Sequence, residues 1–198
     1  MRLKDLLAEK RQAMLDQWVD HIIAGYPQET SSFLRSQKDR FNNPVGHTII
    51  EGTGAILDEI AKALSHPGED AGQAVAGYLD SILRVRAVQG FTASSAVGFV
   101  FELKGIIRNV LGPAAQQPGM HDQLAAFDKE VDKLALLSFD IFMKCREKIY
   151  ELKAGEFERQ TYRLLQQARL IKSQEEEKKE EKEKAPGGGK KEEGEVTR

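Results

Sequence analysis

Residues 120–149 have the sequence MHDQLAAFDKEVDKLALLSFDIFMKCREKI, in which apolar side chains recur at intervals of three and four residues. These intervals match the turn of an α-helix and differ from the two-residue alternation of a half-buried strand. The segment therefore predicts one long amphipathic helix, and no stop signal follows before Gly155. Its predicted core positions are Leu124, Phe127, Val131, Leu134, Ile141, Cys145 and Ile149.

The segments that precede this helix are also rich in helix-forming residues and are separated by glycine and proline. They predict helices over about residues 2–24, 44–64, 70–89 and 93–111, with a polar connection between the first two. Asn43 followed by Pro44 is a strong start signal, because Asn caps free N–H groups and Pro fits the first helical position. Thr92 is the predicted N-cap of the fourth helix. Close approach of a neighbouring helix is expected at Gly46, Gly52 and Gly54.

Beyond the long helix, apolar residues continue at a seven-residue spacing. We define the linker seam as the positions Tyr150, Phe157, Leu164 and Ile171, which alternate with Ala154, Thr161 and Ala168. Because these three alternating positions are small or polar, the pattern predicts a weak coiled coil, and its pairing is expected to depend on the domain that precedes it. We therefore expect a helical domain over residues 1–155, a linker helix over 156–184 and a disordered, charged tail over 185–198.

The composition excludes several functional classes. The 198 residues include 29 Lys and Arg against 31 Asp and Glu, so the chain lacks the basic excess of a nucleic-acid binder. It contains no apolar run long enough to span a bilayer, and its N-terminus does not resemble a signal peptide. A single cysteine, Cys145, cannot form an intrachain disulfide. We expect a cytoplasmic protein that binds neither nucleic acid nor membrane.

The chemistry-bearing residues do not form a catalytic, metal or cofactor motif. The four histidines, His21, His47, His66 and His121, are scattered, and none has a partner at helical ligand spacing. The segment 78–91, where a globin-like domain would place a proximal histidine, contains none. Tyr78 is the remaining alternative there as an axial ligand. No nucleophile elbow or phosphate-binding loop occurs, so we expect no enzymatic activity, no metal and no cofactor.

Arg86 is the most informative charged residue, because it follows Val75, Leu79 and Ile82 at helical spacing and so lies beside an apolar stripe. A long basic side chain in such a place usually extends its charged end into solvent. A sharper hypothesis pairs Arg86 with Glu102 or Asp140, which lie on apolar stripes of their own.

Three segments together resemble one known family: residues 43–47 (NPVGH), residues 84–104 (RVRAVQGFTASSAVGFVFELK) and residues 139–148 (FDIFMKCREK). They are similar to the RsbRD N-terminal sensory domain, the N-terminal domain of RsbT co-antagonists of the RsbR type in the bacterial stressosome. The resemblance covers about residues 3–165. Its candidate signature or structural residues are Asn43, Pro44, His47, Arg84, Arg86, Glu102, Lys104, Asp140 and Arg146.

The resemblance implies an all-helical, non-haem, globin-like dimer of five to six helices, whose last helix leaves as a linker and carries a signal onward. Members of the family continue into a C-terminal STAS domain that carries phosphorylated threonines. This chain ends in a Lys, Glu and Gly tail, so the sensory half is expected to stand alone. The expected partner is another protein that the resemblance does not identify, and STAS-domain or switch-kinase proteins, bound in trans, are the candidates.

These observations lead to one functional hypothesis and two alternatives. The hypothesis is a non-enzymatic, homodimeric sensory protein of a stress-response pathway, which acts through changes in helix packing. The first alternative is a carrier of a small molecule or cofactor that serves a metabolic complex. The second is an assembly adaptor, with the helices docking one partner and the charged tail another.

Overall fold

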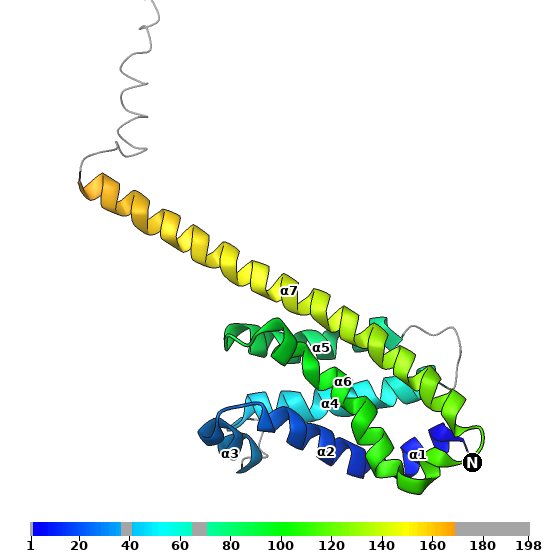
Figure 1. Cartoon of the computed structure of the whole chain (residues 1–198). Coiled ribbons are helices and arrows are strands. Elements are labelled where there is room, and N and C mark those ends of the chain that lie inside the picture. The colour runs from blue at the N-terminus through cyan, green and yellow to red at the C-terminus, as the bar shows by residue number, and fades with distance from the viewer. Residues whose placement is uncertain (1, 37–40, 65–70, 169–198) are drawn as a thin grey trace, which may run out of the picture. The chain divides into compact units, whose positions relative to one another are not determined.

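The computed structural model describes residues 2–36, 41–64 and 71–168, and every regular element in these ranges is a helix (Figure 1). The prediction of an all-α chain is confirmed. The elements are α1 (Leu3–Glu9), α2 (Arg11–Ala24), α3 (Gln28–Ser36), α4 (Pro44–Ala63), α5 (Ala71–Val88), α6 (Ala93–Leu111), the short 3-10 helix η1 (Gly112–Gln116) and α7 (Met120–Gln167).

The chain divides into two compact units, Met1–Ile149 and Tyr150–Arg198. The first unit contains α1 to α6 and the first part of α7. Within it α4 packs along α5, α2 contacts both α4 and α6, and α1 contacts α2 and α4. Within the described part of the second unit, residues 150–167 are the remainder of α7.

Three predicted helix boundaries are confirmed by the capping geometry. Asn43 is the N-cap of α4, and Pro44 is its first residue. The Thr92 hydroxyl accepts a hydrogen bond from the Ser95 N–H at 3.3 Å and so caps α6. Gly90, with φ of +79°, supplies the left-handed conformation that ends the turn after α5.

The prediction of one N-terminal helix over residues 2–24 is wrong, because the helix is interrupted at Lys10. Lys10 has a non-helical backbone (φ −102°, ψ 14°), and its ammonium group donates to the Val110 carbonyl at 3.0 Å. This contact joins residues that are 100 positions apart. The leucine spacing continues across the break, so the hydrophobic pattern alone does not reveal it.

Two short elements were not predicted. The segment expected as a polar connection after residue 27 forms α3, whose Leu34 is buried in the core while Phe33 is exposed. After α6 the chain continues as η1 through Pro113 before α7 begins at Met120. Both elements are short helices with few apolar positions, for which periodicity is a weak signal.

Trp18 of α2 is a fully buried residue of the core of the first unit. Its indole N–H donates to the Phe99 carbonyl at 2.7 Å, and the two rings lie 6.0 Å apart. Gly52 lets α5 pack closely on α4, because a Cβ atom there would lie 3.0 Å from Ile82 Cδ1. Buried residues of α7 that join this core include Leu124, Phe127, Val131, Leu134, Ala135 and Phe142.

Of the three glycines expected to admit a neighbouring helix, Gly52 and Gly54 do so. A Cβ atom at Gly54 would lie 3.2 Å from Nη2 of Arg11, the first residue of α2. The expectation for Gly46 is wrong, because that glycine makes room for the Asn43 cap of its own helix.

Within residues 2–36, 41–64 and 71–168, no helix is both long and apolar enough to cross a bilayer.

Candidate interaction surfaces

Asn43 fastens the start of α4 to the end of α3. Its side-chain oxygen accepts a hydrogen bond from the Gly46 N–H at 2.8 Å, and its side-chain amide donates to the Leu34 carbonyl at 2.9 Å. The side chain is buried. Asn43 and the adjoining Pro44 therefore have a structural role as a joint between two helices.

His47 lies in the first turn of α4 and is partly exposed. Its Nε2 atom is 3.2 Å from a carboxylate oxygen of Glu51, one helical turn further on. The surroundings of His47 thus resemble an ordinary helix surface.

The predicted ion pair of Arg86 with Glu102 or Asp140 is wrong, and so is the prediction that its charged end reaches solvent. Arg86 is only 2% exposed. Nη1 donates to the Ser95 and Ala96 carbonyls at 3.0 and 3.1 Å, and Nη2 donates to a carbonyl at the end of α2, 3.4 Å away. Backbone carbonyls therefore take the place of the expected carboxylate.

Three aromatic rings complete the surroundings of Arg86. Its guanidinium carbon lies 4.8 Å from the ring centroid of Phe99, 5.1 Å from that of Phe91 and 5.7 Å from that of Tyr26. Ring faces attract a cation and so offset part of its lost hydration. Burial nevertheless lowers the pKa of Arg86 from its ordinary value, against the opposing effect of Tyr26.

Two polar atoms in this interior are left without a hydrogen bond. The Tyr26 hydroxyl and the Arg86 Nε are both buried, and neither has a partner among the described residues. Burial raises the pKa of Tyr26, while the charge of Arg86 acts in the opposite direction. The cluster of Arg86, Tyr26, Phe91 and Phe99 connects α2, α5 and α6.

The remaining signature residues of α6 and α7 lie near the surface and apart from Arg86. A carboxylate oxygen of Glu102 is 3.9 Å from Nε2 of His21, which links α6 to α2. The ammonium group of Lys104 is 2.6 Å from Asp132 and links α6 to α7. Asp140 is exposed. The structure does not bring the nine candidate residues together into one site.

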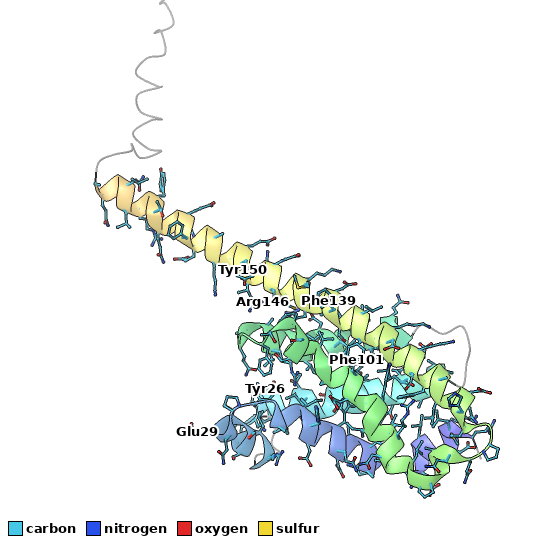
Figure 2. The ribbon with its side chains drawn as sticks, in the orientation of Figure 1. Tyr26, Glu29, Phe101, Phe139, Arg146 and Tyr150 are labelled. Atoms are coloured by element: carbon cyan, nitrogen blue, oxygen red, sulfur yellow. The ribbon has the colours of Figure 1, made fainter. Side chains whose placement is uncertain are left out.

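Cys145 on α7 packs at the edge of the core, as predicted for a small apolar side chain. Its Sγ lies 3.8 Å from Asp80, which also pairs with Arg84 one turn away on α5. Burial and the Asp80 carboxylate both raise the pKa of the Cys145 thiol, so the thiol stays protonated near neutral pH. Arg146 follows on the same helix (Figure 2).

An exposed apolar patch on α6 and α7 was missed by the sequence reasoning. We define the α6–α7 patch as Phe101, Leu136, Phe139 and Met143, all of which are exposed. Figure 2 labels two of them, Phe101 on α6 and Phe139 on α7. Besides the Lys104 pair, Arg108 of α6 pairs with Asp128 of α7, so the two helices are joined beside the patch. The intervals of three and four residues from Leu136 to Met143 were visible in the sequence as a second stripe.

The linker seam is exposed wherever it is described. Tyr150 is 56%, Phe157 71% and Leu164 65% exposed, and no residue of 150–168 is buried. Ile171, the last predicted seam position, and the predicted tail over 185–198 lie outside the described residues. The helix itself passes through Gly155 without interruption.

A groove of about 600 Å³ lies between α1 and α4. Arg11 closes one part of it and donates two hydrogen bonds to the Asp58 carboxylate, at 2.6 and 2.8 Å. The groove is lined by Lys4, Asp5, Leu7, Ala8, Arg11, Leu57, Asp58, Ala61 and Lys62.

In the part of the chain that the structure describes, no three His, Cys, Asp or Glu side chains are arranged to hold a metal ion.

Comparison with known proteins identifies one family. The family described as the RsbT co-antagonist protein rsbRD N-terminal domain matches residues 12–156. A relative in Archaeoglobus fulgidus, an uncharacterised protein, is 26% identical over 153 residues, which cover 75% of this chain and 85% of the relative. No solved structure gave a significant match.

Proposed function

The chain belongs to the RsbRD N-terminal domain family, and on this basis we propose that it is the sensory component of a stress-response signalling pathway of the stressosome type. It acts without catalysis, by changing the packing of its helices and its contacts with other proteins. We place it in the cytoplasm, where STAS-domain and switch-kinase proteins are its candidate partners. The stimulus shifts the balance between two arrangements of similar energy.

The observation that carries this proposal is the exposed linker seam. Aromatic and aliphatic side chains at Tyr150, Phe157 and Leu164 recur every seven residues, and each is more than half exposed. Apolar residues at this spacing are the pairing face of a coiled coil. The seam therefore supports a homodimer in which the linker helices of two copies lie against each other.

The α6–α7 patch supports the same partner. Leu136 and Met143 precede Tyr150 at the same seven-residue spacing, so one sequence register continues from the patch into the seam. Interfaces between subunits are enriched in Phe, Tyr and Met at their centres. We propose that a second copy covers the patch and the seam, and that this pairing carries the signal along α7.

The test of the dimer is analytical ultracentrifugation of the purified chain and two variants. Phe157→Glu puts a charge on the seam and should weaken dimerisation at least about tenfold, because the charge must be desolvated or the seam opened. Leu152→Glu is the matched control, since Leu152 is also exposed on this helix but lies off the seam. It should leave the dimer unchanged.

The same variants test the route of the signal. Partner proteins captured from the native host should bind the Leu152→Glu variant and lose affinity for Phe157→Glu. An unchanged dimer together with unchanged partner binding in the Phe157→Glu variant would refute the seam as the signalling element. Native mass spectrometry of the captured species also reports any bound small molecule, which separates a sensor that acts through proteins from a carrier.

A further inference from the structure

Helix α1 is fastened to three other helices by polar contacts of its own and of the residues that follow it. The backbone N–H of Leu3 donates to the Gln123 side chain of α7 at 2.7 Å. Lys10 donates to the end of α6, and Arg11 donates to Asp58 of α4. The apolar side chains of α1, which are Leu3, Leu6 and Leu7, are all buried. The family match begins at residue 12, so α1 lies before the matched region.

The groove between α1 and α4 has the size of a small-molecule site. Its volume of about 600 Å³ falls inside the range of about 300–1,000 Å³ that is typical of ligand pockets. Ala8 on α1 and Ala61 on α4 give its walls small apolar surfaces, above the buried Leu7 and Leu57. Lys4 also borders a second hollow of about 190 Å³, which Gln123 of α7 lines as well.

The charges around the groove favour an anionic ligand. Of the two carboxylates in the lining, Asp58 is held by Arg11, and Asp5 lies 3.4 Å from Nε of Arg2. Lys4 makes no ion pair within the described residues. The other lysine of the lining, Lys62, pairs with Glu59. The ammonium group of Lys4 is therefore the charge that a ligand can pair with, next to the apolar wall at Ala8.

We propose that this groove binds a small amphipathic carboxylate, with the acid group at Lys4 and the apolar body between Ala8 and Ala61. The ligand holds α1 against α4. Because the backbone N–H of Leu3 is hydrogen-bonded to Gln123, the ligand also stabilises the contact of α1 with the start of α7. This proposal gives the sensor its ligand and in that respect rests on the proposed function. Binding itself does not depend on any partner.

The first test is a titration of the full chain with octanoate, followed by the backbone amide signals in two-dimensional NMR. Saturable shifts are expected at residues 4–11 and 57–62. Octanol has the same apolar body without the charge and should bind about fivefold more weakly, the effect of one surface ion pair. Octylamine has the same apolar body with a positive charge, which Lys4 repels, and should bind more weakly than octanol. Equal binding of octanol, or saturable shifts confined to other residues, would overturn the proposal.

Three variants locate the site. Ala61→Trp fills the groove and should abolish the octanoate shifts, whereas Ala126→Trp, an equal change at the second hollow, should leave octanoate binding in place. Lys4→Gln should weaken octanoate about fivefold and leave octanol unchanged. Thermal melting checks that each variant folds, and if Ala61→Trp does not, Lys4→Gln decides alone. Unchanged octanoate affinity in Lys4→Gln overturns the proposal.

The outcome is separable from that of the proposed function. The Phe157→Glu variant alters the seam and leaves the groove residues untouched, so it should bind octanoate like the parent chain. Octanoate binding with no loss of dimer in Phe157→Glu supports the groove and contradicts the seam. A seam-dependent dimer with no octanoate shifts at the groove contradicts the groove and leaves the seam supported.

Discussion

Arg86 and Phe157 each lie where the other type of residue is usually found, the charged residue in the interior and the aromatic residue at the surface. The charged arginine is 2% exposed in the interior of the first unit, whereas the aromatic phenylalanine is 71% exposed on α7. The interior provides the arginine with two strong carbonyl acceptors and three ring faces. The surface around Phe157 provides no apolar neighbour that buries it.

The difference teaches how each residue contributes to the protein. Arg86 stabilises the fold of the single chain. Its removal would take a hydrogen-bond donor away from the carbonyl groups that it contacts and would leave a cavity in the core. Phe157 adds nothing to the fold of a single chain, since its apolar surface stays in water. In the proposed dimer, its contribution comes from the second copy that covers it. The four predictions that follow contrast residues of the first kind with residues of the second.

The largest effect is expected for Arg86→Ala. The change leaves the Ser95 and Ala96 carbonyls without the guanidinium and opens a cavity, so the free energy of unfolding should fall by about 3 kcal/mol. Urea unfolding followed by circular dichroism measures it. Arg84→Ala is the control, because Arg84 is exposed and pairs only with Asp80 among the contacts described above; its loss should stay near about 0.5 kcal/mol. Equal losses in the two variants would contradict the assigned role of Arg86.

A smaller loss, about 1–2 kcal/mol, is expected for Asn43→Ala, which removes the cap of α4 and its bond to Leu34. Asn43→Asp separates the two contributions. The aspartate keeps an oxygen for the Gly46 N–H but has no N–H to donate to the Leu34 carbonyl. Urea unfolding should place Asn43→Asp between the parent chain and Asn43→Ala. A full loss in Asn43→Asp would show that the bond to Leu34 carries the whole effect.

The third effect is a loss of stability at alkaline pH that depends on Tyr26. Burial raises the pKa of Tyr26 in the folded chain above its ordinary value of 10.0. Between the two values the unfolded chain has lost this proton and the folded chain has kept it, so stability falls as the pH rises, by up to about 1.4 kcal/mol per pH unit. Below the ordinary pKa the contribution is fully present. Stability measured from pH 9 upward should fall less steeply in Tyr26→Phe, and parallel curves would contradict the effect.

The smallest effect is expected for Phe157→Ala on the stability of the first unit. Measured below the dimerisation concentration, the free energy of unfolding should change by less than about 0.5 kcal/mol. Phe127→Ala is the matched contrast in the same helix, because Phe127 is fully buried and should cost about 3–5 kcal/mol. A loss above about 1 kcal/mol in Phe157→Ala would mean that Phe157 is packed within a single chain.

Much of the fold could be predicted because its signals are local. The cap at Asn43, the proline after it, the cap at Thr92 and the start of α7 at Met120 all follow from residue type and spacing. The break at Lys10 could not be predicted, because it coincides with a bond to a carbonyl 100 residues away. A leucine stripe that fits both one helix and two helices carries no information on such a break.

The surfaces could be predicted only in part. The seam was visible as spacing, but exposure of the α6–α7 patch depends on which of the apolar stripes of α7 faces the core. The partners of Arg86 were missed for a different reason. A search for opposite charge considers Glu102 and Asp140, whereas the acceptors are backbone carbonyls, which every residue carries and no sequence distinguishes.

The pairing of Asn43 with Pro44 also bears on the chemical ageing of the protein. An asparagine deamidates when the backbone nitrogen of the next residue attacks its side-chain amide, and proline has no N–H with which to form that ring. The amide of Asn43 is both a helix cap and the donor to Leu34, so its conversion to aspartate would loosen α3 from α4. The residue that starts the helix therefore also protects its neighbour from spontaneous damage over the lifetime of the chain.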